Sequence, residues 1–306
     1  MAANNSLADD DLLNRHIRFF SLQFLVTIFL SVNLLLIVTF FQKEYFYTTA
    51  RYILFAVMLL SDSLLLIVSN ILLIFTHFRI NIQVWLCIII CVVPLLYLTV
   101  TPVTLTAMTL ERYVAICMPL RHGELCSTRN TMHGILIIHG LSSVPCIAIL
   151  STIFVSASLS FYTKYWMCLV ELVLLQAWQH HLRSAVYQFQ FLVLCIMIVF
   201  SYIKIMKVAR AASGEDKKST KKGLRTVLLH GFQLLLCFIQ MWCPFIDAAV
   251  LQVNYGLYEI VRYLNFVFFY LAPRCLSPLI YGLRDEVFYH ALKNVAYLGL
   301  YKRNNM

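Results

Sequence analysis

The chain has 306 residues, of which 61% are hydrophobic and only 12% are charged, and its mean hydropathy is +0.80. This composition excludes a water-soluble globule with an ordinary polar surface and identifies an integral membrane protein. The formal net charge of +10 is explained by the orientation of the chain in the membrane and requires no nucleic-acid partner.

Seven apolar runs have the length of about 20 residues that crosses roughly 30 Å of hydrocarbon as a helix. The chain contains no internal repeat and no stretch typical of a separate soluble domain. We therefore predict an all-α fold in which residues 1–306 form one seven-transmembrane helix bundle, with the two termini on opposite sides of the membrane. The predicted spans cover residues 19–42, 52–76, 84–110, 132–155, 186–206, 225–250 and 261–283.

The distribution of Lys and Arg decides the orientation, because short cytoplasmic loops carry the excess of positive charge. With the N-terminus outside, the basic run between residues 204 and 225 and the tail of residues 284–306 lie in the cytosol, where they face anionic lipid or a cytosolic protein. Residues 1–18 then form an extracellular N-terminus, and Asn4 becomes an acceptor for glycosylation. Apolar residues at helical spacing in 287–295 predict a short amphipathic helix on the inner membrane face.

Two of the ten cysteines are expected on the outer side of the membrane. Cys87 begins the third span, and Cys168 lies in the long loop after the fourth. A disulfide between them would tie this loop over the mouth of the bundle as a lid; the alternative is two unpaired thiols. His180 and His181 of the same loop are adjacent and lack further ligands, so we expect a solvated loop and no metal site.

Residues 108–122, MTLERYVAICMPLRH, close the third span. Glu111 and Arg112 stand at the end of a long apolar helix, where an arginine or acid turned toward lipid costs about 2.5 to 3.5 kcal/mol. Protein contacts must therefore hold this pair, and we interpret it as a switch.

Short motifs along the chain follow the order and approximate spacing of those in rhodopsin-like G-protein-coupled receptors. MTLERYVAICMPLRH is similar to the MAYDRYVAICxPLxY signature of vertebrate odorant receptors, and PRCLSPLIYGLRD is similar to their PxLNPxIYxxR. The segment PRCLSP most resembles the corresponding segment of fish odorant receptors. The residues that carry the resemblance are Asn33, Asp62, Glu111, Arg112, Tyr113, Trp242, Pro244, Ser277, Pro278, Leu279, Ile280 and Tyr281.

The resemblance implies a plasma-membrane receptor, in the cilia of olfactory neurons, that binds a small-molecule odorant. It also implies activation of a heterotrimeric G protein of the olfactory stimulatory type, which raises cAMP, and it implies neither an enzyme nor a cofactor. Glu111 would hold Arg112 at rest, and Arg112 would be released toward the G protein and Tyr202 or Tyr281 when the sixth span swings outward. The expected hinge residues are Trp242, Pro244 and Pro278.

Arg274 is the main departure from the family pattern, because it lies near mid-membrane, one helical turn before Pro278. In the wider class, an acid at the position of Asp62 commonly helps to hold a sodium ion. An unpaired arginine at that depth is costly. We predict that Arg274 pairs with Asp62 within about 6 Å and takes the place of the sodium; the alternative turns Arg274 toward lipid or a backbone carbonyl.

The ligand cavity should open outward between the third, fifth, sixth and seventh spans. Pro94 stands where amine receptors carry an aspartate, and residues 261–283 contain no lysine that would bind retinal. Asp247 either binds a cationic group of the ligand or, as we favour, pairs with Arg262. The candidate lining residues are Leu95, Leu98, Thr99, Tyr187, Gln190, Phe245, Ile246, Asp247, Ala249 and Tyr270.

Other functions of a membrane protein fit the sequence less well. A receptor of the same class for another small molecule, a lipid or a peptide has the same fold and is the closest alternative. A transporter usually shows paired repeats and acids near the midplane, whereas only Asp62 lies that deep here. An enzyme is disfavoured because no pair of nucleophile and base is visible among the spans.

Overall fold

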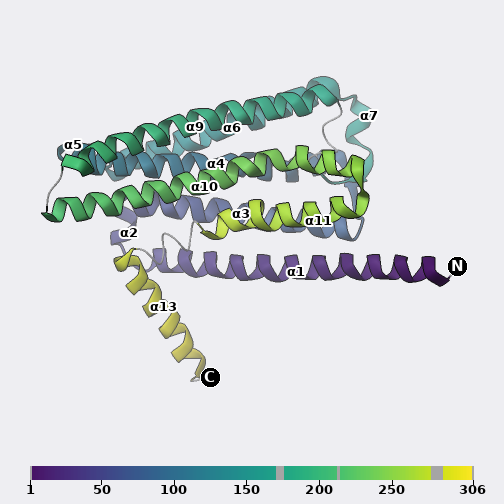
Figure 1. Cartoon of the computed structure of the whole chain (residues 1–306), viewed down its shortest axis with the longest axis horizontal. Helices are drawn as coiled ribbons and strands as arrows, with labels where there is room; N and C mark the ends of the chain where they lie inside the picture. The colour runs from purple at the N-terminus through teal and green to yellow at the C-terminus, as the bar shows by residue number, and fades with distance from the viewer. Residues whose placement is uncertain (1, 170–175, 212–213, 277–284, 305–306) are drawn as a thin grey trace.

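The structure is a computed structural model that describes residues 2–169, 176–211, 214–276 and 285–304. Long helices run side by side along the longest axis of the molecule (Figure 1). The prediction of an all-α seven-helix bundle with a further C-terminal helix is confirmed. The helices of the bundle are α1 (Ala2–Phe41), α3 (Ala50–His77), α4 (Val84–Cys117), α6 (Thr128–Ser156), α9 (Ala177–Ala211), α10 (Gly214–Val253) and the shorter α11 (Tyr255–Asn265).

Six helices within the described residues are long and apolar enough to cross a membrane, namely α1, α3, α4, α6, α9 and α10. The seventh span begins with α11, continues as the π-helix η1 (Phe266–Leu271) and returns to α-helix over residues 272–276. The rest of the predicted span, with Ser277, Pro278 and Tyr281, lies outside the described residues. Helix α1 begins at Ala2, inside the segment that the sequence predicts as a polar N-terminus.

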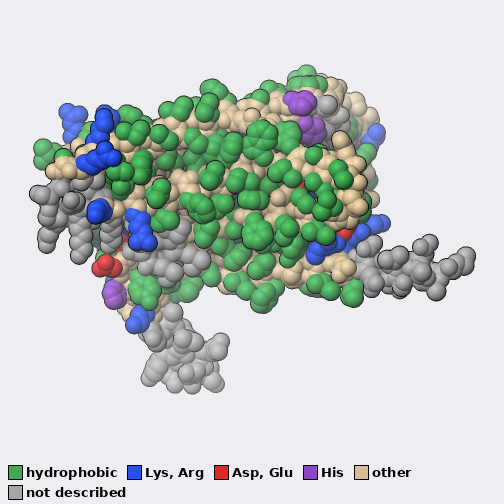
Figure 2. Space-filling model, in the orientation of Figure 1, with side chains coloured by type: hydrophobic (Ala, Val, Ile, Leu, Met, Phe, Trp, Pro, Cys, Tyr) green, Lys and Arg blue, Asp and Glu red, His purple; other side chains and the backbone are tan. Residues whose placement is uncertain are grey.

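The outward surface of the bundle is apolar over the length of the spans. Large side chains such as Phe24 of α1, Leu136 of α6 and Phe189 of α9 are exposed, and apolar side chains cover most of the face seen in Figure 2. In water such a surface would be unstable, whereas in lipid it is the expected solvent contact. This arrangement is that of a multi-pass membrane protein.

Lysine and arginine gather at one end of the bundle, where α9 ends and α10 begins (Figure 2). We call this the basic end. The short helices α2 (Tyr45–Thr48) and α5 (Pro119–Leu125) lie at the same end, and α13 (Glu286–Asn304) leaves the bundle there (Figure 1). The exposed cations of α9 and α10 at the basic end are Lys204, Lys207, Arg210, Lys221 and Arg225.

Helix α4 is the centre of the bundle, because it packs against α3, α6, α9 and α10. The hydroxyl groups of three of its buried threonines are hydrogen-bonded within the helix. Thr104, Thr106 and Thr109 each donate a hydrogen bond to the carbonyl four residues earlier in the same helix, at 2.7–2.9 Å. A helix rich in hydroxyl groups can therefore lie at the core of a bundle that lipid surrounds.

The opposite end of the bundle carries a two-stranded sheet that the sequence did not predict. Strand β1 (Asn81–Gln83) pairs antiparallel with β2 (Tyr165–Met167), in the register Ile82 to Trp166. Helix α7 (Leu159–Tyr162) precedes β2. Helix α9 begins nine residues before the predicted fifth span, so the prediction that His180 and His181 lie in a loop is wrong. Both belong to the first turns of α9, and β1 packs against the start of α4.

Asp285 attaches α13 to the rest of the fold. Its Oδ1 accepts hydrogen bonds from the Phe288 amide, at 3.0 Å, and from the Tyr52 hydroxyl, at 2.9 Å. Its Oδ2 lies 2.9 Å from a guanidinium nitrogen of Arg51. The same carboxylate thus caps the start of α13 and joins it to the start of α3, while Phe288 packs against the ring of Phe46.

Candidate functional site

The predicted switch lies in the last turns of α4, near the basic end. Arg112 Nε is 3.5 Å from Glu111 Oε2, and the Glu111 side chain is buried. His122 of α5 approaches the same acid from the other side, with Nε2 3.3 Å from Glu111 Oε1. The sequence analysis did not select His122. This residue ends the motif PLRH, whose proline begins α5.

The tyrosines of the predicted switch are only partly described. The ring of Tyr113 packs against Phe200 of α9, with 5.9 Å between ring centroids. Tyr113 and Tyr202 both border the main apolar core, whereas Tyr281 lies outside the described residues. The structure therefore places the described tyrosines at the α4–α9 contact beside the charged pair.

A second polar contact joins α4 to α10 close to the switch. His230 of α10 is almost fully buried, and its Nδ1 lies 3.1 Å from the Thr109 hydroxyl. Thr109 precedes Glu111 by two residues, so a displacement of α10 would disturb a contact next to Glu111. Nothing in the sequence distinguishes His230, because a histidine among apolar helix residues is more often a core residue than a functional one.

Asp62 and Arg274, the predicted polar pair, are both buried and lie close together. Arg274 Nε is 3.7 Å from Asp62 Oδ1, and the Thr101 hydroxyl donates to the same oxygen at 2.6 Å. Arg274 also donates to the Tyr270 carbonyl at 2.6 Å and to Gln240 Oε1 at 3.3 Å. One carboxylate oxygen therefore faces both a hydroxyl and a guanidinium group.

A sodium ion beside Asp62, which the family resemblance raises, does not fit this group of residues. The positive charge that a carboxylate in lipid requires is already supplied by Arg274, at 3.7 Å. A second cation would meet the guanidinium as a like charge. The chemistry of the site is that of an internal ion pair, not of a cation-binding pocket.

The predicted hinge residues of the sixth span lie within α10. Pro244 is inside this helix and cannot donate the backbone hydrogen bond that the Gln240 carbonyl would otherwise receive. The Trp242 ring contacts Phe238 one turn earlier and Phe245 three residues later, with centroid distances of 6.2 and 5.7 Å. Pro278, the predicted hinge of the seventh span, lies outside the described residues.

The candidate ligand residues of α4 and α9 form one group. Leu95 is buried, and the Tyr187 hydroxyl donates to its carbonyl at 3.4 Å. Thr99 and Gln190 bond instead to α6, because Thr99 donates to the Ser142 carbonyl at 3.1 Å and Gln190 donates to the Leu141 carbonyl at 3.3 Å. Leu98 is partly buried in the cluster around the disulfide.

The candidates of α10 and the seventh span form a second group. Asp247 accepts a hydrogen bond from the Asn265 amide at 2.7 Å, whereas Arg262, its expected partner, donates to the Tyr258 hydroxyl at 2.7 Å. Phe245, Ile246 and Ala249 are exposed beside Asp247. The Tyr270 hydroxyl bonds to Ser69 of α3. Asn265 is thus a partner of Asp247 that the sequence analysis did not consider.

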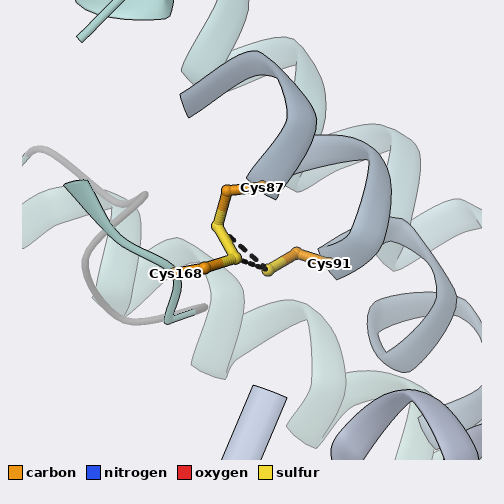
Figure 3. A group of neighbouring side chains, drawn as sticks. All are labelled: Cys87, Cys91 and Cys168. Carbon is orange, nitrogen blue, oxygen red and sulfur yellow. Dashed lines mark hydrogen bonds between the residues drawn. A yellow bond between two sulfur atoms is a disulfide. The ribbon is translucent and has the colours of Figure 1, made fainter. Parts of the chain in front are cut away.

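The predicted disulfide between Cys87 and Cys168 is present and links the start of α4 to the chain just after β2 (Figure 3). A third sulfur lies beside it. Cys91 Sγ is 3.8 Å from Cys87 Sγ and 4.0 Å from Cys168 Sγ. Since two of the three sulfurs are joined, this cluster offers one thiol and does not supply the ligand set of a structural metal site.

Comparison with known proteins places these features in a family. Residues 32–281 match the family described as 7 transmembrane receptor (rhodopsin family). The chain is 43% identical to the zebrafish (Danio rerio) protein Odorant receptor 131-2 over 281 residues, which are 92% of this chain and 86% of that protein. It is also 26% identical to zebrafish Galanin receptor 2a, over 63% of this chain and 53% of that protein. Mouse Melatonin receptor type 1A is 22% identical, over 62% of this chain and 54% of that receptor.

Proposed function

Because the chain belongs to the rhodopsin family of seven-transmembrane receptors and, within it, to the fish odorant receptors, we propose that it binds a small-molecule odorant on the outer side and activates a heterotrimeric G protein. The G protein is of the olfactory stimulatory type, so that activation raises cAMP. The observation that carries the proposal is the 43% identity to an odorant receptor over 92% of the chain. The family consists of receptors, not enzymes.

The resting state of this mechanism depends on Glu111, which holds Arg112 at 3.5 Å. An odorant acts only through its different affinity for two arrangements of the bundle. The weak point of α10 at Pro244 allows the basic end of this helix to move away from α4. Arg112 then leaves Glu111 and meets the G protein together with Tyr202 or Tyr281.

The nature of the odorant follows from the candidate residues near the outer ends of the helices. Most are apolar, and the polar groups among them include the Tyr187 hydroxyl and the amide of Gln190. These features suit a small and partly polar molecule. Asp247, which bonds to Asn265, serves to join α10 to α11, and we expect the variant Asp247→Asn to keep its responses to every active odorant.

A peptide receptor of the same class is the second candidate function, supported by the 26% identity to a galanin receptor. That similarity covers 63% of the chain, against 92% for the odorant receptor. The odorant function is therefore the better supported one. Another small-molecule ligand has similarly weak support from the 22% identity to a melatonin receptor over 62% of the chain, whereas no reported similarity supports a lipid ligand or solute transport.

A ligand screen in cells that express an olfactory stimulatory G protein tests the proposal. Amino acids, bile-salt-like acids, amines, steroids and peptides are applied, and cAMP is measured beside an Arg112→Ala control. We expect a response to at least one class that the control lacks. Responses to peptides alone would select the second candidate, and solute or ion flux without any cAMP response would reject the receptor function.

The proposed location is the ciliary plasma membrane, with an extracellular N-terminus and a cytosolic basic end that contacts anionic lipid. An epitope tag placed before residue 1 should be stained on intact cells, and the variant Asn4→Gln should remove any glycosidase-sensitive mass. A tag that is stained only after permeabilisation would place Arg112 on the wrong side for a G protein.

A further inference from the structure

Arg274 is the largest fully buried side chain among the described residues, with a relative exposure of 1%. A guanidinium group inside a membrane bundle is costly unless its charge is paired with an acid and hydrogen-bond acceptors lie beside it. Here the charge is met by Asp62, and the ring of Tyr270 lies under the guanidinium at 4.4 Å. The remaining described contacts are hydrogen bonds to the Tyr270 carbonyl and to Gln240.

These contacts come from three different parts of the bundle. Asp62 belongs to α3 and is itself fixed to α4 through the Thr101 hydroxyl. Arg274 and Tyr270 belong to the seventh span, where Tyr270 is in the π-helix η1; short π-helical turns occur frequently at functional sites. Gln240 belongs to α10. A single side chain therefore connects α10 to the α3–α4 core.

The position of Gln240 within α10 gives this connection its significance. Gln240 lies four residues before Pro244, so its carbonyl is the one that loses its helical hydrogen bond because proline has no amide hydrogen. The turn that contains Gln240 and Pro244 is consequently the turn at which α10 bends most easily. Its Gln240 side chain, 3.3 Å from a guanidinium nitrogen of Arg274, ties this same turn to the seventh span and α3.

We propose that Arg274 is an internal pin that, through Gln240, holds the hinge turn of α10 against α3 and so favours the resting arrangement. The guanidinium group occupies the place beside Asp62, so that no soluble cation is needed to stabilise this arrangement. The inference rests on the proposed function only where movement of α10 is read as a signal. The tie itself is a property of the bundle.

The variant Gln240→Leu tests the pin, because leucine is close in size to glutamine and cannot accept the hydrogen bond. A hydrogen bond to a charged group contributes enough to shift the equilibrium between the two arrangements roughly tenfold. We expect basal cAMP per receptor at the cell surface to rise severalfold. The matched control is Gln252→Leu, which changes an exposed glutamine at the far end of α10 and should leave basal cAMP unchanged.

A distance measurement on the purified receptor separates this inference from the proposed function. Spin labels carried by unnatural amino acids at Arg129 of α6 and Leu228 of α10, both exposed, report the position of the basic end of α10. Gln240→Leu should populate a longer distance in the absence of any ligand or G protein. If the receptor does not raise cAMP at all but this distance still lengthens, the pin stands and the proposed signalling fails.

A second variant protects the test against misfolding. Gln240→Glu places a carboxylate against the guanidinium group, so it should strengthen the tie, lower basal cAMP and sharpen the short-distance population. Identical distance distributions in wild type, Gln240→Leu and Gln240→Glu would overturn the inference. So would a longer distance in Gln240→Glu than in the wild type.

Discussion

Arg112 and Arg274 are both arginines of the helix bundle that face an acid, but they are held in different ways. Arg112 faces the preceding residue of its own helix at 3.5 Å, near the basic end, and its side chain is 17% exposed. Arg274 faces an acid on another helix, and its side chain is 1% exposed. The contact between Arg112 and Glu111 lies within α4, whereas the second pair connects α3, α10 and the seventh span. A charge pair within one helix is suited to act as a switch. A pair that connects several helices stabilises the fold, and we call the pair of Arg274 and Asp62 the fastener.

Removal of the fastener should have the largest effect on stability. The variant Arg274→Met leaves Asp62 as a buried carboxylate without its cation, and breaking a buried pair in this way typically costs about 3–5 kcal/mol. We expect a much lower melting temperature of the purified receptor and little receptor at the cell surface. Thermal unfolding followed by tryptophan fluorescence is the measurement.

A double variant sharpens the same prediction. Asp62→Asn combined with Arg274→Met removes both charges and keeps an acceptor for the Thr101 hydroxyl. It should recover at least half of the stability lost in Arg274→Met. If Arg274→Met unfolds at the temperature of the wild type, the side chain is not a fastener and the contrast with Arg112 disappears.

The next largest loss is expected at Asp285, which joins two parts of the fold at the basic end. Asp285→Ala removes the cap of α13, the hydrogen bond from Tyr52 and the ion pair with Arg51, so we expect a loss of about 2 kcal/mol. Residues 286–304 should become accessible to protease earlier than the rest of the chain. His290→Ala, an exposed change in the same helix, is the control and should leave the protease pattern unchanged.

The sequence predicted the parts of this arrangement that charge and hydropathy dictate. The spans follow from the cost of polar groups in lipid, and an arginine at mid-membrane leaves few possible partners, which is why Arg274 and Asp62 could be paired in advance. Cys87 and Cys168 were paired because both were expected on the oxidising side. Where a misplaced residue would carry a large free-energy cost, few arrangements are possible, so its position or partner can be predicted from the sequence.

Neutral polar residues were less readable because nothing in their chemistry demands one particular partner. The face that a helical residue presents changes by about 100° per position, so small errors in helix rotation move it to another neighbour. The hydrogen bonds of Thr99 and Gln190 to carbonyls of α6 were not predicted, and Gln240 and His230 were not selected. The contact of Asp247 with Asn265 depends in the same way on the packing of α10 against α11.

Thr101→Val should lower the stability of the fold less than Arg274→Met or Asp285→Ala. The hydroxyl donates to Asp62 Oδ1 at 2.6 Å, and deletion of one hydrogen bond to a charged group costs about 1.5–3 kcal/mol, of which the lower end applies because Arg274 still pairs with the acid. Thr106→Val is the matched control, since its hydroxyl bonds only within α4 in the described contacts. Equal melting temperatures for the two variants would show that Thr101 does not support the pair.

The smallest change in stability is expected for Arg112→Ala. Its contact with Glu111 lies within one helix at 3.5 Å, and His122 stays beside Glu111 after the change, so the melting temperature should move little. Signalling should nevertheless be lost, because Arg112 is the group that meets the G protein in the proposed mechanism.

Glu111→Gln should act in the opposite direction and raise basal cAMP, since the charge that holds Arg112 is removed while the side chain keeps its size. Stability is measured by thermal unfolding, and signalling is measured as cAMP per receptor at the cell surface. A large loss of stability in Arg112→Ala with preserved cAMP responses would exchange the roles of the two arginines, because Arg112 would then be the fastener.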